Sequence, residues 1–420
     1  MTTKPISVGR HTLPNGLRLV HSYDPTTAMV AVDVLYNVGA RDENRSLTGI
    51  AHLFEHLMFG GSVNVPEFDS ELEAAGGRSN AWTSNDFTNF YNTLPAQNID
   101  TTLHLESDRM LSPAFSERTL EVQRGVVIEE FKQQCLDRPY GDLFHHLRRI
   151  AYAETHPYSW PVIGLTPDHV AKVTMDDARQ WFFSHYAPNN AVLAISGGVP
   201  FDVACAKAEE WFADVPSRTI AARNEPEPGF PTTPVIETVR GNVPLPVICV
   251  AFPMSSYGTP EYFAADTITD ILSVGTSARL RNNLVNGSGL GLIADADASI
   301  LGCEGPGLLL VNMQLAEDTD AGIERSLQLL DAELKKMTVP GNVSGHELER
   351  TLNNFEASFR FSNIGYLPLA INLAQAELHG EDINHTVTDR RRLTPEIITT
   401  TAESIFSRPS ATIVYRGAVS

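Results

Sequence analysis

The stretch that decides the fold spans residues 49–62 and reads GIAHLFEHLMFGGS. It contains His52, Glu55 and His56 in the order His-x-x-Glu-His, the inverse of the His-Glu-x-x-His motif of many zinc sites. On a helix, the first and fifth residues of this pattern lie one turn apart on the same face. Both imidazoles can therefore bind one metal ion, and Glu55 can reach a water molecule beside that ion.

The remaining faces of this helix are apolar, with Ile50, Leu53, Phe54, Leu57 and Met58. This composition predicts a buried helix, and burying two histidines and a glutamate is costly unless something pairs them. A bound metal would do so. Two imidazoles and one carboxylate suit Zn²⁺ in an open catalytic site, where water takes the fourth position. The alternative is a histidine pair that packs in the core or at the surface without a metal.

Composition limits the classes of function. A chain of 420 residues fits two domains of about 200 residues each. Its 42% hydrophobic and 20% charged residues are typical of a globular protein. A formal net charge of −20 disfavours nucleic acid and anionic membranes as partners. The four cysteines are scattered and form no CxxC pair, so we expect no cysteine metal site. We also expect the protein to reside in a reducing compartment.

The N-terminal residues 1–21 lack an apolar run of signal-peptide length. No stretch approaches 18 consecutive apolar residues, so no membrane-spanning helix is expected. We therefore expect a soluble, cytoplasmic protein.

A Pro-rich segment near the middle, EPEPGFPTTP at residues 225–234, predicts a stiff, extended connector. It divides the chain into a metal-bearing domain (1–215), a linker (216–236) and a second, metal-free domain (237–420). The two halves are weakly similar. Residues 173–199 and 393–419 each begin with a Thr N-cap and an acidic first turn, continue as a helix and end in an apolar strand.

The segment ADTITDILSVGTS (265–277) matches residues 50–62 in the same way, with Thr267 and Ile271 where His52 and His56 stand. Each half contains strands, helices and a final strand. Residues 79–95 form a two-strand pattern broken at Asn85 and Asp86, and helices are expected at 99–112 and 117–134. These patterns predict an α+β fold of two similar domains, each an antiparallel-rich sheet covered by helices.

The chain resembles the pitrilysin and insulysin type of zinc metallopeptidases, in particular the branch of the mitochondrial processing peptidases and their bacterial relatives. The resemblance covers the whole chain. It rests on five motifs in order: GIAHLFEHLMFGGS, GGRSNAWTSNDFTNFYNTLP, LESDRM, QRGVVIEE and HPYSWPVIG.

A third metal ligand must come from outside the motif, and the segment LEVQRGVVIEEFKQQ offers Glu121, Glu129 and Glu130. The resemblance implies Glu130, at the end of the VVIEE run, with Glu129 as the fallback. Family members often carry a supporting Glu seven positions earlier, where this chain has Gln123. Glu121 or Asp108 are the candidates to replace that supporting acid.

The resemblance also implies a reaction. Glu55 would be the general base of peptide hydrolysis beside the zinc. The substrate would add as a strand to a sheet edge formed by SNAWTS, with Asn80, Ala81 and Thr83 nearest the reaction. An ordinary structural strand is the alternative for these three residues.

One expected feature is missing. The second half of family members usually supplies an Arg and, seven residues on, a Tyr, after a Ser-x-Arg-Leu motif that reads SARL (277–280) here. The two positions hold Val285 and Leu292, which cannot donate hydrogen bonds. We therefore expect a heterodimer whose sister subunit supplies Arg and Tyr, with a homodimer as the alternative. A non-catalytic scaffold subunit is the competing class; such members typically lose the His-x-x-Glu-His residues, which this chain keeps.

Overall fold

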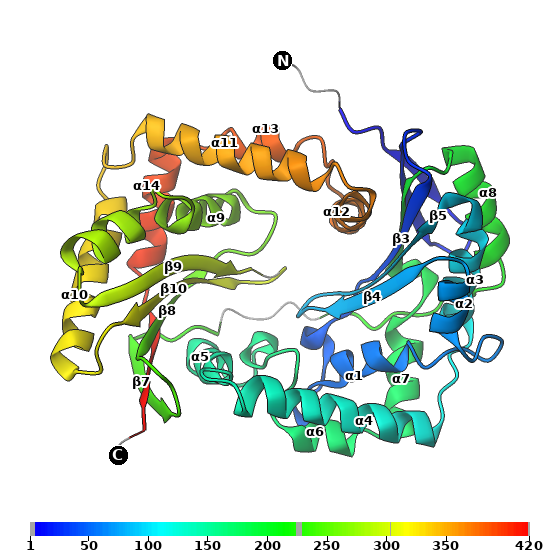
Figure 1. The fold of residues 1–420 in the computed structure, drawn as a ribbon, viewed down its shortest axis with the longest axis horizontal. Helices are drawn as coiled ribbons and strands as arrows, with labels where there is room; N and C mark the ends of the chain where they lie inside the picture. The colour runs from blue at the N-terminus through cyan, green and yellow to red at the C-terminus, as the bar shows by residue number, and fades with distance from the viewer. Residues whose placement is uncertain (1–4, 224–228, 303, 419–420) are drawn as a thin grey trace. The chain divides into compact units, whose positions relative to one another are not determined.

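The computed structural model describes residues 5–223, 229–302 and 304–418. The chain folds into two compact units, each assembled from three separate segments (Figure 1). Unit 1 groups residues 1–130, 162–224 and 358–386, and unit 2 groups residues 131–161, 225–357 and 387–420. The segments therefore alternate along the sequence.

Unit 1 contains a six-stranded sheet in the order β1-β2-β6-β3-β5-β4, with only the β2–β6 pair parallel. Its strands are β1 (Gly9–Thr12), β2 (Arg18–Tyr23), β3 (Met29–Tyr36), β4 (Arg78–Thr83), β5 (Thr88–Pro95) and β6 (Ala191–Gly197). β4 is an edge strand that pairs with β5 alone. The two-strand pattern predicted for residues 79–95 is thus confirmed.

The helices of unit 1 are α1 (Ile50–Leu57), α2 (Phe68–Ala74), α3 (Ile99–Leu111), α4 (Glu117–Phe131), α6 (Pro167–Lys172), α7 (Met175–His185), α8 (Phe201–Phe212) and α12 (Tyr366–Leu378). Short 3₁₀ turns lie at η1 (Ala40–Asp42), η2 (Arg45–Leu47), η3 (Ala96–Asn98) and η6 (Pro188–Asn190). One face of the sheet packs on α1, α3, α7 and α8 in the main apolar core. The opposite face packs on α12.

Unit 2 contains a five-stranded sheet in the order β7-β11-β8-β10-β9, with β7 and β11 parallel. Its strands are β7 (Val235–Gly241), β8 (Val247–Met254), β9 (Ile293–Leu301), β10 (Gly307–Leu315) and β11 (Ala411–Gly417). Its helices are α5 (Leu143–Ala151), α9 (Pro260–Ser273), α10 (Asp320–Met337), α11 (Gly345–Ser362), α13 (Thr386–Arg390) and α14 (Pro395–Phe406), with π-type segments at η4 (Lys132–Leu136) and η7 (Leu280–Ser288) and a 3₁₀ turn at η5 (Pro157–Ser159).

The two sheets share one topology. The order β2-β6-β3-β5-β4 in unit 1 corresponds to β7-β11-β8-β10-β9 in unit 2, and the parallel pair occupies the same place in both. The predicted N-caps agree with this, because Thr174 caps α7 and Thr394 caps α14 through their hydroxyls. The predicted α+β fold of two similar domains is confirmed.

The observed units differ from the contiguous domains 1–215 and 237–420 that the sequence predicted. α5 packs against the unit 2 sheet through Leu143 and Leu147, and α12 packs against β3 and β6 of unit 1 through Ala370 and Leu373. Each of these segments buries its apolar face in the unit distant from it in sequence. Part of the predicted linker (216–236), residues 224–228, lies outside the described residues.

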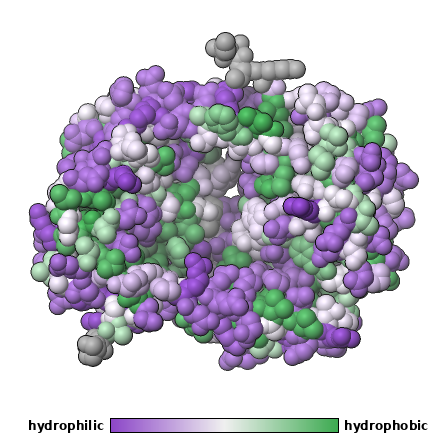
Figure 2. Space-filling model, in the orientation of Figure 1, coloured by the Kyte–Doolittle hydropathy of each residue, from purple (hydrophilic) through white to green (hydrophobic). Residues whose placement is uncertain are grey.

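Figure 2 shows hydrophilic residues over much of the face drawn, with apolar residues in smaller groups between them, as the net charge of −20 leads one to expect. Among the described residues, no helix combines the length and the apolar character needed to cross a membrane.

Candidate metal centre

The motif helix α1 is held at its N-terminus by an acidic side chain. Gly49 is the N-cap, with a φ of 91° that favours glycine, and it offers no capping side chain. Oε1 of Glu43 accepts hydrogen bonds from the backbone N–H of Gly49 (3.0 Å) and of Ala51 (2.9 Å). A carboxylate at a helix N-terminus satisfies free N–H groups and complements the helix dipole. Glu43 therefore fixes the start of the helix that carries the motif.

The two histidines of α1 and Glu130 of α4 converge on one point (Figure 1 shows both helices). Nε2 of His52 lies 3.6 Å, and Nε2 of His56 3.5 Å, from the same oxygen of Glu130. Two ligands on a tetrahedral zinc with bonds of about 2.1 Å lie roughly 3.4 Å apart. The three side chains thus fit the ligand spacing of one zinc ion, which would keep a fourth position for water. Within the described part of the chain, they form the one group of His, Cys, Asp or Glu residues that could hold a metal.

The three side chains interact electrostatically. Burial lowers the pKa of His52, which favours the neutral imidazole that a metal needs. Burial also lowers the pKa of His56, but its hydrogen bond with Glu130 and the charge of Glu55 outweigh this, and the net shift is upward. The hydrogen bond from His56 lowers the pKa of Glu130. Glu130 is therefore a carboxylate at neutral pH, as a metal ligand must be.

Glu55 lies on α1 beside the two histidines but is not part of the three-residue group. Its Oε2 accepts a hydrogen bond of 2.5 Å from the hydroxyl of Thr83, the last residue of β4. Burial raises the pKa of Glu55, and the Thr83 hydrogen bond partly counters this. A carboxylate with a raised pKa near a metal can accept and return a proton.

The edge strand β4 runs from a side pocket to the metal centre. The side chain of Asn80 accepts a hydrogen bond from the backbone N–H of Ala81 (2.8 Å). The pocket, of about 480 Å³, lies between α2 and β4, and its lining includes Asn80, Phe59 and the carboxylates of Asp69 and Glu73. An extended chain added to β4 would place alternate side chains toward such a pocket.

The two histidines differ in their further hydrogen bonds. Gln123 of α4 forms a side-chain hydrogen bond with His56. Nδ1 of His52 is buried and has no hydrogen-bond partner among the described residues. Metal-binding histidines usually donate their second N–H to a carboxylate or carbonyl. Here a neutral amide stands beside one histidine, at the position where the sequence resemblance led us to expect a glutamate.

Three other predicted residues lie elsewhere. Glu129 is exposed and does not belong to the group of His52, His56 and Glu130. Glu121 is ion-paired with Arg124, and Asp108 accepts hydrogen bonds from Ser62 and Asn64, which fixes the loop after α1. Each carboxylate is thus engaged in another contact, and neither belongs to the group of His52, His56 and Glu130; a supporting role for Glu121 or Asp108 stays a prediction. Sequence position alone did not give the direction of these side chains.

Unit 2 has no comparable group at the matching positions. Thr267 of α9 stands where His52 stands, and its hydroxyl accepts a hydrogen bond from Arg390 (3.0 Å). Arg279 of the SARL motif forms an ion pair with Glu347 (2.6 Å). Val285 and Leu292 pack against the apolar core of unit 2. They supply no polar group in place of the missing Arg and Tyr.

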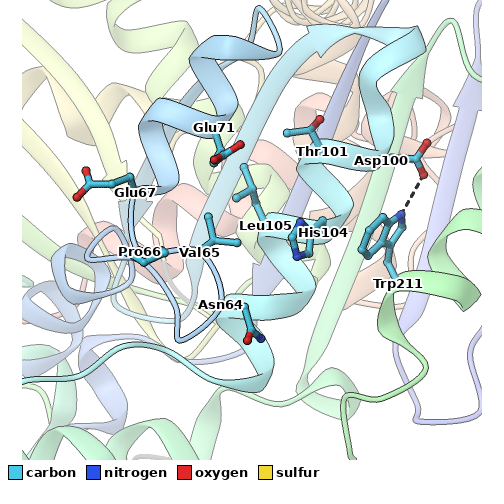
Figure 3. Close-up of a pocket in the computed structure, with 10 residues that line it drawn as sticks. All are labelled: Asn64, Val65, Pro66, Glu67, Glu71, Asp100, Thr101, His104, Leu105 and Trp211. Carbon is cyan, nitrogen blue, oxygen red and sulfur yellow. Dashed lines mark hydrogen bonds between the residues drawn. The ribbon is translucent and has the colours of Figure 1, made fainter.

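A second hollow on unit 1, of about 490 Å³, lies among α2, α3 and the end of α8 (Figure 3). Asp100 accepts a hydrogen bond from the indole N–H of Trp211 (2.9 Å) and is paired with Lys207. The ring of His104 stacks on Trp211, with centroids 4.8 Å apart. None of the three candidate metal ligands, His52, His56 and Glu130, lines this hollow.

Sequence reasoning did not anticipate Glu43. No pattern marks a carboxylate six residues before the N-cap as a helix cap, because the turn that brings it back depends on the tertiary path between residues 43 and 49. The one local sign was Gly49, which stands at the N-cap position of α1 and has no side chain to cap the helix.

Two family models match the chain. The model described as Insulinase (Peptidase family M16) matches residues 18–159, which contain the candidate metal ligands His52, His56 and Glu130. The model described as Peptidase M16 inactive domain matches residues 172–355.

Among curated proteins, the zinc protease PqqE of Helicobacter pylori is 28% identical over 356 residues, which cover 83% of this chain and 78% of that protein. The beta subunit of the mitochondrial-processing peptidase of Saccharomyces cerevisiae is 27% identical over 405 residues, which cover 91% of this chain and 83% of that subunit.

The same fold occurs in solved structures. A protease from Helicobacter pylori matches with a TM-score of 0.89 at 24% identity, over 98% of this chain and 100% of the other. A peptidase M16 inactive domain from Pseudomonas fluorescens matches with a TM-score of 0.86 at 16% identity, over 99% of both chains. At these identities the likeness concerns the fold alone.

Proposed function

We propose that this chain, which belongs to the insulinase-type M16 family of peptidases, is a zinc-dependent endopeptidase that cleaves short unstructured peptides. The observation that carries the proposal is the convergence of His52, His56 and Glu130 beside Glu55. The family relationship, with relatives named as zinc proteases, supports the same chemistry.

His52, His56 and Glu130 would hold the zinc, and Glu129 would take no part. When bound, zinc would lower the pKa of a water molecule and polarise the substrate carbonyl. Glu55 would take the proton from the attacking water and deliver it to the leaving amine. Thr83 would keep the Glu55 carboxylate oriented toward that water through its hydrogen bond. Each step by the protein is thus a binding or a proton transfer at a named side chain.

The substrate would lie as an extended strand against β4, whose free edge offers backbone hydrogen bonds. Asn80 and Ala81 form the contact edge, and the Asn80 side chain would have to release the Ala81 N–H when a substrate strand pairs there. Most extended segments of a folded protein are already paired within it, whereas an unstructured peptide is free to pair with this edge, so unstructured peptides fit it best. The pocket beside Phe59 would take one substrate side chain.

We further propose that the active enzyme is a heterodimer. This chain has Val285 and Leu292 where relatives of this type carry a substrate-binding Arg and Tyr, and a sister subunit would supply them. One relative is itself named a subunit of a processing peptidase. Loss of such donors costs about 10²-fold to 10³-fold in rate per donor, so the chain alone would be a poor enzyme. A homodimer that uses other donors is the alternative.

A scaffold subunit is the second candidate function, and the match of residues 172–355 to a model of an inactive domain favours it. Cleavage of a mixed set of unstructured peptides, with zinc quantified in the same sample and Glu55→Gln as the control, separates the cases. Cleavage by the wild type alone would support the peptidase and reject the required partner. One zinc per chain without cleavage points to a missing subunit. A sample that contains no zinc and cleaves no peptide would favour the scaffold.

A further inference from the structure

A buried ion pair lies close to the pocket between α2 and β4. Arg109 and Glu106 are both on α3, and their side chains are 1% and 0% exposed. Nε of Arg109 donates to the Glu106 carboxylate over 2.9 Å, and Nη2 donates to its two oxygens over 2.5 Å and 2.6 Å. The side chain of Asn92, on β5, donates to the same carboxylate (2.5 Å). No step of the proposed reaction uses this pair.

Three phenylalanine rings surround the remaining side of the guanidinium. Nη1 of Arg109 is buried and has no hydrogen-bond partner among the residues that the structure describes. The central carbon of the guanidinium lies 4.4 Å from the ring centre of Phe90, 4.7 Å from that of Phe68 and 5.7 Å from that of Phe59. A cation within about 6 Å of an aromatic ring centre is attracted to the ring. The guanidinium therefore attracts rings from β5, from α2 and from the loop after α1.

Phe59 connects these rings to the pocket. Phe59 lines the pocket between α2 and β4, whereas Arg109 does not. The ring of Phe59 meets the ring of Phe68 edge to face, with centres 6.0 Å apart, and lies at the same distance from the ring of Phe90. Phe68 is the first residue of α2, and Leu72, one turn later, lines the pocket. The guanidinium thus lies behind the pocket wall and contacts both Phe59 and α2.

Stability alone does not require an ion pair at this place. Replacement of a buried ion pair by well-packed apolar residues often leaves stability unchanged or raises it. What the pair adds is a fixed position, because the guanidinium is planar and three hydrogen bonds to Glu106 hold it in one orientation. A methionine at position 109 would fill similar space, but its unbranched side chain changes shape easily. The rings that pack on it would be held less firmly.

We propose that Arg109 is a positioning residue that fixes the wall of the pocket between α2 and β4, and thereby sets how strictly this pocket selects a substrate side chain by size. Glu106 orients the guanidinium, the guanidinium holds the ring of Phe59, and that ring limits the space for the substrate. A fixed wall separates small from large side chains, whereas a wall that moves accepts both. The inference rests on the proposed peptidase function, because the pocket is taken to receive a side chain of the substrate.

The test replaces both members of the pair, because removal of Arg109 alone would leave a buried carboxylate unpaired. In the double variant Glu106→Gln with Arg109→Met, both charges are gone and the amide oxygen can still accept from Asn92. We would measure kcat and KM for unstructured peptides that carry Ala, Leu or Trp at each position beside one cleaved bond. At one position, the ratio of kcat/KM between the best and the poorest peptide should fall at least about fivefold, mainly through KM. Zinc content should stay at the wild-type value.

A similar pair in unit 2 provides the matched control. Arg390 is paired with Asp266, and its guanidinium carbon lies 4.2 Å from the ring centre of Phe355 and 5.5 Å from that of Phe263. The double variant Asp266→Asn with Arg390→Met removes the same kind of contact from the other unit and should keep the wild-type preference. A thermal melt verifies the fold of each variant.

Arg109→Lys is the second test variant, and it serves alone if the double variant does not fold. It keeps the positive charge beside Glu106 but lacks the planar group that three hydrogen bonds hold. Its size preference should weaken in the same direction. A folded double variant, or a folded Arg109→Lys variant in its place, with the wild-type preference at every position would overturn the proposal. An equal change in the unit 2 control would also overturn it, because the effect would then not be specific to the pocket.

A binding measurement separates this inference from the proposed function. If the wild-type chain alone cleaves no peptide, that result bears on the proposed function and not on Arg109. The same peptides, labelled with fluorescein, are then titrated by fluorescence anisotropy with Glu55→Gln chains that carry or lack each further change. The ratio of their Kd values decides the inference by the same criterion. Peptides that do not bind at all would overturn it, because the pocket would then receive no substrate side chain.

Discussion

Thr83→Val isolates the contact between the edge strand and the proposed general base. Valine has nearly the shape of threonine but lacks the hydroxyl that donates to Oε2 of Glu55 over 2.5 Å. A hydrogen bond to a charged group contributes about 1.5–3 kcal/mol when its partner is buried. Because Thr83 and Glu55 are half-buried, we take the lower end of this range. Each 1.36 kcal/mol is about tenfold in rate, so kcat/KM should fall roughly tenfold to thirtyfold.

The assay is the initial rate of cleavage of a fluorogenic unstructured peptide, with the sister subunit added if the chain alone is inactive. Zinc content should stay at the wild-type value, because Thr83 is not a metal ligand. Thr83→Ser is the control, since it keeps the hydroxyl and should retain most of the activity. An unchanged kcat/KM in Thr83→Val with normal zinc would refute the reasoning. An equal loss in Thr83→Ser would also refute it, because the hydroxyl would then not be the cause.

Three other variants test separate contacts. Glu130→Gln should weaken zinc binding at least roughly 100-fold in a chelator competition, whereas Glu129→Gln should not; the reverse order would transfer the ligand to Glu129. Glu43→Ala should lower the free energy of unfolding by about 1–2 kcal/mol in a denaturant titration, since it frees the N–H groups at the start of α1; an unchanged midpoint would contradict the cap. Burial raises the pKa of Asp33 to about 8. Because this folded-state pKa lies above the unfolded value of 3.8, the cost of keeping Asp33 protonated is absent below pH 4 and grows until pH 8. Asp33→Asn, which can still accept the hydrogen bond from Asn89, should therefore match the wild type at pH 4 and exceed its stability by up to about 4 kcal/mol at pH 7, and a difference independent of pH would exclude the buried acid as the cause.

The sequence was sufficient for what depends on local pattern. The spacing of His52, Glu55 and His56 follows from helix geometry, and the strand pair that became β4 and β5 follows from alternation around a polar turn. The helices predicted at 99–112 and 117–134 were observed at Ile99–Leu111 and at Glu117–Phe131 with a π-type continuation to Leu136. Each of these features depends on residues that lie close together in the sequence.

What the sequence could not give depends on packing between distant segments. Adjacent glutamates 129 and 130 point about 100° apart on a helix, and only the position of α4 against α1 decides which one faces the histidines. The same limit explains Glu43 and Asp108, whose partners are set by loops rather than by spacing. The division into units was missed because α5 and α12 have apolar faces that fit either sheet by composition alone.

The alternation of segments between the two units bears on how this protein can be made and cut. Each unit needs three stretches of chain that are separated by residues of the other, so a nascent polypeptide cannot complete the first unit until residues 358–386 have been synthesised. Such long-range closure slows folding and exposes apolar surface in the meantime. A shortened chain that ends in the Pro-rich segment would lack α12 and leave Val20, Ala31 and Leu35 uncovered on its sheet. Expressed separately, neither half of the sequence would be a foldable domain, and aggregation is the expected fate of both.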